Sequence, residues 1–285
     1  MLTVGKSLAR LVRQVLRLVL IFIFTLLKMM VLVHIRAVIL GADTNMKYYG
    51  LCSGSKGNCW MIQTKKTIVM LDCGMSKKYL LEKMQECNVN SKAIDALLIT
   101  HTHSDHVKQL KAFSHLPVYS VCPLDVGVRV QPYQSFQLND LKITPLAASH
   151  DAEGCCGYLF ENEGQKLLYL TDTGYVSKVN LDWMQNLDYY ILESNHDVEM
   201  LMNTSRPFAL KSRIYSDTGH LCNEDCGKIL ALCAGDNTRE ITLAHLSEEA
   251  NTPQKAYDVV KSYLVHYKGL LQVAHQRDVV QGGTE

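Results

Sequence analysis

The sequence gathers metal-binding side chains in one short segment, His-Thr-His-Ser-Asp-His at residues 101–106. The segment directly follows an apolar run with the pattern of a strand. In extended or turn geometry His101 and His103 point to the same side of the chain, so both imidazoles can reach one cation. Asp105 and His106 can then turn towards a second cation beside it. The pattern therefore predicts a site for two metal ions at the end of a strand.

Two metal ions need more ligands than this segment supplies, and further candidates follow other strand-like runs. His150 would complete three histidines on the first ion, Asp172 could bridge both ions through its two oxygens, and His245 would complete the second site. Taken alone, a histidine after a strand is more often a turn residue, and the ordered set is what favours ligation. The predicted metal ligands are His101, His103, Asp105, His106, His150, Asp172 and His245.

This donor set indicates hydrolysis at phosphorus. Two divalent cations outweigh the charges of Asp105 and Asp172, so the site would attract an anion. Metal ions about 3.5–4 Å apart can generate hydroxide at neutral pH and bind both the attacking and the leaving oxygen of an in-line displacement. A phosphodiester fits that description. With oxygen and nitrogen donors only at the second site, Mn²⁺ competes with Zn²⁺ as the expected ion.

Other residues are candidates for roles beside the metal ions. Asp72 is expected to accept hydrogen bonds that orient the histidine segment rather than to ligate. His220 lies just before Asn223, the expected cap of a helix, and could donate a proton to the leaving oxygen or hold a phosphate. A turn histidine bonded locally is the alternative for His220. The residues expected to take part in catalysis are Asp105, His220 and Asp72.

Two segments are candidates for binding the substrate. The loop at residues 53–58 is rich in glycine and hydroxyl groups, so its backbone N–H groups could hold a phosphate beside Ser53, Ser55 and Asn58. The same composition also makes an ordinary tight turn. Lys211 and Arg213 precede His220 closely enough to flank the same cleft, although a solvated helix face explains them equally well.

Composition and charge limit the class of protein. With 47% hydrophobic and 20% charged residues, the 285-residue chain is neither disordered nor collagen-like. Residues 1–45 contain six basic side chains and one acidic one, a net charge of +5, which leaves −4 for the rest of a chain whose total is +1. A net negative charge on the catalytic part gives only partial support for nucleic-acid binding, because a protein that binds many phosphates needs clustered Lys and Arg side chains. The ten cysteines include no C-x-x-C pair, so reduced thiols in a reducing, cytoplasmic compartment are expected.

The first 45 residues differ in composition from the rest of the chain. The uncharged apolar run 18–27 has ten residues, against about 20 for a transmembrane helix, and no signal-peptidase cleavage pattern comes after it. A translation start at Met46 is favoured. A basic membrane anchor through residues 11–40 and a cleaved signal are the alternatives.

Beyond Met46, short apolar runs alternate with turn signals and amphipathic stretches, which predicts a mixed α/β (α+β) domain. The predicted strands are 48–52, 59–63, 67–71, 96–100, 117–121, 141–146, 157–161, 166–170, 189–193 and 240–243. The predicted helices are 76–87, 107–114, 181–187, 207–215, 224–234 and 252–267. Because no linker rich in Gly, Pro or Ser divides residues 46–285, they are expected to form a single domain.

The metal-binding residues, together with Asp72 in Leu-Asp-Cys-Gly, resemble the five motifs of the metallo-β-lactamase superfamily. The resemblance implies a four-layer αβ/βα sandwich with two facing sheets, helices outside and the metal site at one edge. The segments 53–58, 193–197, 219–225 and 244–247 are similar to those of YycJ/WalJ-type metallohydrolases, over a match from Met46 to about Asp258. That family usually has Ser at the position of Cys222, and the stretch 121–141 is shorter than expected, which puts substrate choice in question.

The resemblance implies a nuclease that digests double-stranded DNA from 5′ to 3′. The leading hypothesis is therefore a hydrolase with two divalent ions, Zn²⁺ or Mn²⁺, that cleaves phosphodiesters at DNA ends. One alternative is a small-molecule hydrolase of a thioester, lactone or cyclic nucleotide on the same fold. Another is a metal-binding regulatory protein that has lost catalysis, against which the complete ligand set argues. A membrane partner is expected only if residues 1–45 are retained.

Overall fold

The computed structural model describes residues 46–283. The expected N-terminal extension 1–45, with any anchor or signal in it, lies outside these residues. Among the helices of the described part, none is long and apolar enough to span a lipid bilayer.

The first sheet joins an antiparallel meander to a parallel half. Its strand order is β14-β1-β2-β3-β4-β5-β6, antiparallel from β14 to β3 and parallel from β3 to β6. The strands are β1 (Lys47–Cys52), β2 (Cys59–Gln63), β3 (Ile68–Leu71), β4 (Ala96–Ile99), β5 (Val118–Ser120), β6 (Val128–Arg129) and β14 (Val280–Gly282).

The second sheet repeats this plan. Its order is β13-β12-β11-β10-β9-β8-β7, antiparallel from β7 to β10 and parallel from β10 to β13. The strands are β7 (Phe136–Leu138), β8 (Leu141–Ala147), β9 (Cys156–Asn162), β10 (Gln165–Leu170), β11 (Tyr189–Glu193), β12 (Glu240–Ala244) and β13 (Leu270–Val273).

Large aromatic side chains fill the space between the two sheets. Tyr48 and Trp60 from the first sheet meet Tyr189 and Tyr169 from the second, with ring centroids 6.1 Å and 5.9 Å apart respectively. All four side chains are buried in one apolar cluster. Because alternate residues of a strand face opposite sides, the neighbours of these residues pack on the outer faces instead. The sheets therefore present apolar surface on both sides.

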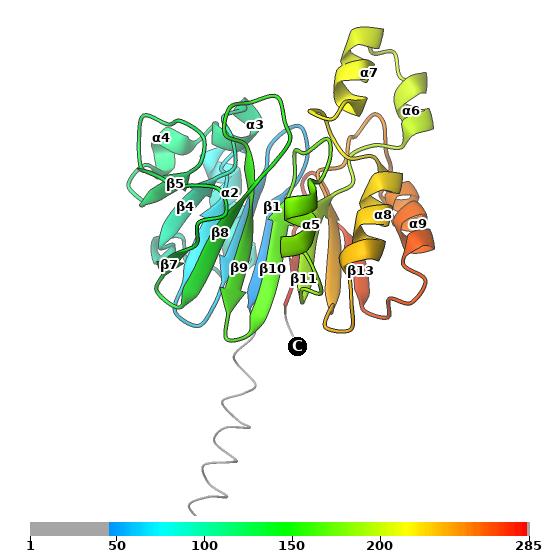
Figure 1. The fold of residues 1–285 in the computed structure, drawn as a ribbon. Coiled ribbons are helices and arrows are strands. Elements are labelled where there is room, and N and C mark those ends of the chain that lie inside the picture. The colour runs from blue at the N-terminus through cyan, green and yellow to red at the C-terminus, as the bar shows by residue number, and fades with distance from the viewer. Residues whose placement is uncertain (1–45, 284–285) are drawn as a thin grey trace, which may run out of the picture. The chain divides into compact units, whose positions relative to one another are not determined.

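Helices cover both outer faces (Figure 1). The first sheet packs against α2 (Lys77–Glu86), α3 (Ser104–Val107) and α4 (Leu110–Phe113). The second packs against α5 (Lys178–Trp183), α8 (Asn223–Cys233) and α9 (Pro253–Tyr263). The remaining helices are the 3₁₀ turn Ser91–Ala93, α6 (Val198–Asn203) and α7 (Phe208–Tyr215). This arrangement confirms the expected four-layer αβ/βα sandwich.

The structure corrects several predicted elements. The predicted helix 107–114 is two short helices, because the backbone N–H of Gln109 donates to the Cys73 carbonyl and interrupts the helical pattern. Helix α8 begins at Asn223 with Cys222 as its cap, whose thiol accepts from the Asp225 N–H. Asn223 is buried and bonds to Ser194 instead of capping. The strands β6, β7, β13 and β14 and the helix α6 were not predicted.

Candidate metal centre and active site

Four of the predicted site residues follow strands of the parallel halves of the sheets. Asp72 follows β3, His101 follows β4, Asp172 follows β10 and His245 follows β12. Parallel strands bring such residues to one edge of the sheets. Asp72, Asp172 and His245 have positive φ angles of 58°, 55° and 57°, a strained backbone for residues other than glycine that is typical of functional sites.

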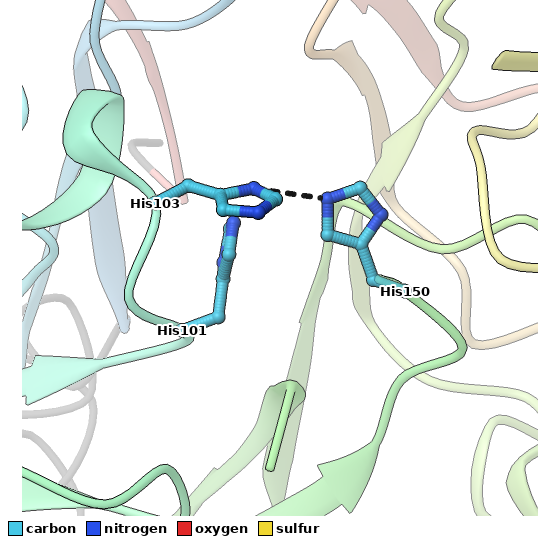
Figure 2. Close-up of side chains that lie close together, drawn as sticks. All are labelled: His101, His103 and His150. Carbon is cyan, nitrogen blue, oxygen red and sulfur yellow. Dashed lines mark hydrogen bonds between the residues drawn. The ribbon is translucent and has the colours of Figure 1, made fainter. Parts of the chain in front are cut away.

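The first histidine cluster joins both sheets. His101, His103 and His150 point towards one another in Figure 2, and their ligand atoms all lie within 4.8 Å of one another. The His103 Nδ1 is 3.3 Å from the His150 Nε2. The His101 ring is 4.7 Å from that of His103 and 5.2 Å from that of His150 between centroids. Three imidazole nitrogens at such spacing fit one cation.

The second cluster lies beside the first. Asp105, His106 and His245 also offer ligand atoms within 4.8 Å of one another. Asp172 lies between the clusters: its Oδ2 is 3.3 Å from the His106 Nε2, and its Oδ1 is 3.5 Å from the His245 Nε2 and 3.8 Å from that of His150. The structure thus brings together all seven side chains predicted to bind metal.

Backbone contacts hold the segment 101–106 in place. The N–H of Cys73 donates to the His106 carbonyl at 2.7 Å, and the N–H of Asn58 donates to the Asp105 carbonyl at 2.8 Å. Gly74 is required at this crossing, because a Cβ there would lie 1.6 Å from the Asp105 carbonyl oxygen. The chain after β3 therefore fixes the position of the histidine segment.

In the second cluster, His106 and His245 each donate a hydrogen bond from the ring nitrogen Nδ1 to a buried carboxylate. The His106 Nδ1 lies 2.8 Å from Asp72, and the His245 Nδ1 lies 2.7 Å from Glu193. A carboxylate can only accept, so both Nδ1 atoms carry hydrogen and both Nε2 atoms face the metal cluster. Asn58 also approaches the His106 Nε2, at 2.9 Å, a contact that a cation on that nitrogen would replace.

The first cluster is oriented in the same way. The His150 Nδ1 donates to the Gly219 carbonyl at 3.0 Å. Thr100 donates its hydroxyl to Asp72 at 2.9 Å and so accepts from the His101 Nδ1 at 3.0 Å. These partners fix the imidazole tautomers and leave the Nε2 of His101 and His150 directed at the shared space.

Three buried atoms in that space make no hydrogen bond: the Nε2 of His101, the Nε2 of His245 and the Oδ2 of Asp172. An unsatisfied buried polar atom costs about 1–3 kcal/mol, so three together need an explanation. Burial lowers the pKa of His101 to about 2, which keeps this imidazole neutral and its Nε2 a lone-pair donor. The residues present therefore fit divalent cations.

The electrostatics of the second cluster also favour a cation. Burial opposes charge on His106 and His245, yet the nearby carboxylates of Asp172, Asp72 and Glu193 raise the pKa of His106 to about 9 and of His245 to about 10. Despite burial, the surrounding imidazoles hold the pKa of Asp172 well below its usual range. Carboxylates that stabilise an imidazolium stabilise a metal cation for the same reason.

The role of Asp72 in orienting the histidine segment can be tested by substitution. We expect Asp72→Asn to weaken metal binding about 10–100-fold, because the amide cannot accept from Thr100 and His106 as the carboxylate does. Competition with a metal chelator, followed by metal analysis, measures this. Asp140→Asn is the matched control, since Asp140 accepts from Thr64 and Thr67 away from the site. Equal metal affinity in the two variants would contradict the role.

Glu193 connects the metal cluster to His220. Its Oε1 accepts from the Nδ1 of His220 at 2.8 Å and of His245 at 2.7 Å. Although Glu193 is fully buried, these two imidazoles lower its pKa to about 2. Sequence reasoning assigned no role to Glu193. The position of Glu193 could have identified it, because Glu193 is a carboxylate at the end of the apolar strand β11 and the predicted ligands also lie at strand ends.

A cavity of about 490 Å³ opens onto the cluster. It is lined by ligand candidates and by His220, together with Ser55 and Arg213 as expected from the sequence. Arg206 and Glu249 line it as well and were not predicted; their side chains pair at 2.9 Å. The volume is within the usual range for a ligand site.

The structure corrects three predicted substrate contacts. Ser53 and Asn58 are buried and bond to the site itself: Ser53 accepts from the His245 N–H, and Asn58 contacts His106. The N–H groups of residues 54, 56, 57 and 58 all donate within the protein, so they are not free to hold a phosphate. Lys211 does not line the cavity, because its ammonium donates to the Met202 carbonyl.

Comparison with known proteins agrees with this geometry. Residues 67–245 match the beta-lactamase superfamily domain. The chain is 33% identical over 239 residues to the exodeoxyribonuclease WalJ of Streptococcus pneumoniae, covering 76% of this chain and 87% of WalJ. It is 34% identical over 222 residues to the exodeoxyribonuclease YycJ of Bacillus anthracis, covering 72% and 84% respectively.

Solved structures show the same fold. The metallo-beta-lactamase fold protein YhfI from Bacillus subtilis superimposes with a TM-score of 0.65 at 19% identity, covering 84% of this chain and all of YhfI. The short form of human tRNase Z gives a TM-score of 0.57 at 15% identity, covering 82% and 98%. Sequence motifs, fold and relatives agree: the chain belongs to the beta-lactamase superfamily and, within it, to the family of WalJ and YycJ.

Proposed function

We propose that the chain is a metal-dependent exodeoxyribonuclease that hydrolyses phosphodiester bonds at DNA ends with two divalent ions, Zn²⁺ or Mn²⁺. The convergence of seven ligand candidates beside a cavity that also contains His220 carries this proposal. The names of WalJ and YycJ support DNA as the substrate. Duplex preference and 5′-to-3′ polarity, expected from the family resemblance, remain part of the proposal.

The ligand candidates divide into two sets. His101, His103 and His150 would hold one ion, and Asp105, His106 and His245 the other, with Asp172 shared. When bound, the ions would supply Lewis acidity and a nucleophile at neutral pH.

The protein's own residues orient the substrate and move a proton. Glu193 fixes the His220 Nδ1, so the opposite nitrogen, Nε2, is the one available to the cavity. There His220 can hold a proton and transfer it to the leaving oxygen. Arg213 at the cavity wall can bind a non-bridging phosphate oxygen after exchanging its partner Asp151 for substrate.

The proposed compartment is the cytoplasm. All ten cysteines lie within residues 46–283, and none forms a disulfide. Reduced thiols are typical of a reducing compartment. Membrane association through residues 11–40 is the alternative.

One observation favours the alternative of a small-molecule hydrolase: both cavity arginines are paired with carboxylates, Arg206 with Glu249 and Arg213 with Asp151. Ionic strength separates the two functions. We expect the logarithm of kcat/KM on end-labelled duplex DNA to fall linearly with the logarithm of salt concentration, because the phosphate backbone dominates affinity. The test uses the full chain with Mn²⁺ or Zn²⁺ and DNA labelled at either end.

The label also reports polarity, because 5′-to-3′ digestion releases a 5′ label first. A neutral ester is the control, since its turnover should hardly respond to salt. Rapid turnover of that ester with no cleavage of DNA would replace the proposed function by the alternative.

A further inference from the structure

Helices α6 and α7 form an arm, residues 198–215, between β11 and α8. The arm stands at the same end of the sheets as α3, beyond the strand ends that carry the metal cluster (Figure 1). Salt bridges tie it to the body on the cavity side: Arg206 pairs with Glu249 and Arg213 with Asp151. The arm is therefore a wall of the cavity with one side directed at the site and another directed at solvent.

The cavity side of the arm is cationic and apolar. Leu210, Arg213 and Ile214 of α7 line the cavity and share one face of the helix, since they are three and four residues apart, and Arg206, which precedes α7, lines it as well. Arg206 and Arg213 are the arginine side chains among the described residues that line this cavity, and no lysine lines it. A phosphate that enters the cavity meets them beside the metal cluster.

The solvent side of the arm carries an exposed aromatic residue. Phe208 is 78% exposed, although it lies between Arg206 and Leu210 in the sequence, both of which line the cavity. Tyr215, seven residues further on, shares its helix face and is 54% exposed. The Phe208 side chain thus stands at the N-terminal end of α7, next in sequence to the cavity wall.

Exposure alone does not indicate a ligand. Val265 is equally exposed, at 78%, but it lines a different cavity with Leu230 and Tyr263, and none of these residues lines the catalytic cavity. What distinguishes Phe208 is its place two residues from a cavity-lining arginine. An aromatic face for a base and a guanidinium for a phosphate, two residues apart in the chain, match the alternating chemistry of a nucleic-acid strand.

We propose that the α6–α7 arm binds the DNA strand as it enters the cavity, with Phe208 stacking on a base outside the cavity and Arg206 contacting a backbone phosphate at its wall. The inference rests on the proposed nuclease function and adds a binding surface to it. Arg206 exchanges Glu249 for the phosphate, and the carboxylate that it releases is 61% exposed, so water can solvate it.

The test compares Phe208→Ala, Phe208→Trp and the matched control Val265→Ala in the full chain with its metal ions. We expect Phe208→Ala to raise the KM for DNA and the Kd from fluorescence anisotropy about 5–100-fold, the usual effect of losing one base stack. Phe208→Trp should keep wild-type values, because indole also stacks. Hydrolysis of bis(p-nitrophenyl) phosphate, which has no base to stack, should be unchanged in every variant.

The outcomes separate this inference from the proposed function. If the wild-type protein digests DNA and Phe208→Ala binds and digests it equally well, the arm is not the binding surface, while the nuclease function stands. An equal loss in Phe208→Ala and Val265→Ala also overturns the inference, because the effect is then not specific to the arm. If the wild-type protein hydrolyses the small ester but not DNA, the proposed function fails and the inference fails with it.

Discussion

Replacing Asp172 with asparagine is expected to reduce DNA hydrolysis by at least about 10³-fold, the equivalent of several kcal/mol of transition-state stabilisation. Asp172 lies within 3.3–3.8 Å of nitrogen atoms of His106, His150 and His245, so its carboxylate is placed to serve both clusters. Asparagine has nearly the same volume and tolerates the left-handed backbone at this position, where φ is 55°. The substitution therefore removes charge and one ligand oxygen while it preserves the fold.

Metal content is the second measurement on this variant. We expect purified Asp172→Asn to retain less than the wild-type amount of bound transition metal, because an uncharged amide cannot replace a bridging carboxylate. Asp236→Asn, a change at an exposed position outside the cavity, is the control and should keep both metal and activity. Wild-type rate and metal content in Asp172→Asn would contradict the two-cluster assignment.

The metal cluster could be predicted because its residues interrupt apolar strands. His101 and Asp172 directly follow buried runs, so a polar side chain there must lie at the edge of a sheet. The parallel order of neighbouring strands then brings such edges together. His245 follows the parallel strand β12 in the same way, whereas His150 follows the antiparallel strand β8 and was identified by its position after an apolar run.

Of the residues that orient the cluster, Asp72 was predicted from the sequence, whereas Glu193 and Thr100 were not. Glu193 contacts His220 and His245, which are 27 and 52 positions away in the chain. Thr100 contacts the adjacent His101, but its hydroxyl is oriented by Asp72, 28 positions away, and no local pattern marks such pairs. The loop 53–58 has the composition of a phosphate-binding turn. Its N–H groups are nevertheless used within the protein, by partners as distant as Gln276. Composition shows what a loop can donate, whereas only the fold shows which donors are already occupied.

The missed strands have a similar explanation. β6 consists of two exposed residues, and β14 is the three-residue segment Val280–Gly282. Segments this short carry no hydrophobic period, so pairing with a neighbouring strand defines them. β14 pairs with β1 across more than 200 residues of sequence, as between Gly282 and Tyr48. The buried strands, by contrast, were predicted to within two residues at either end.

Replacing His220 with alanine is expected to lower kcat on DNA about 10²–10⁴-fold, the usual contribution of a general acid. His220 also lies with Asp172, Glu193 and His245 in a group whose ligand atoms are within 4.8 Å of one another. Metal content should nevertheless stay at the wild-type level, because the seven predicted ligands are all retained and the His220 Nδ1 is bonded to Glu193 instead. His266→Ala is the matched control, since His266 is exposed and lies outside the catalytic cavity. Loss of metal from His220→Ala would instead make His220 part of the ligand set.

Substrates with different leaving groups distinguish the two possible roles of His220. A deoxynucleoside alkoxide needs a proton to depart, whereas p-nitrophenolate leaves readily without one. If His220 donates that proton through its Nε2, His220→Ala should slow hydrolysis of bis(p-nitrophenyl) phosphate far less than that of DNA. If His220 mainly binds a phosphate oxygen, KM should rise for both substrates and kcat should fall equally for both. The bond between the His220 Nδ1 and the buried Glu193 favours the first result, because it orients the ring and leaves the Nε2 as the nitrogen that can reach a leaving oxygen in the cavity.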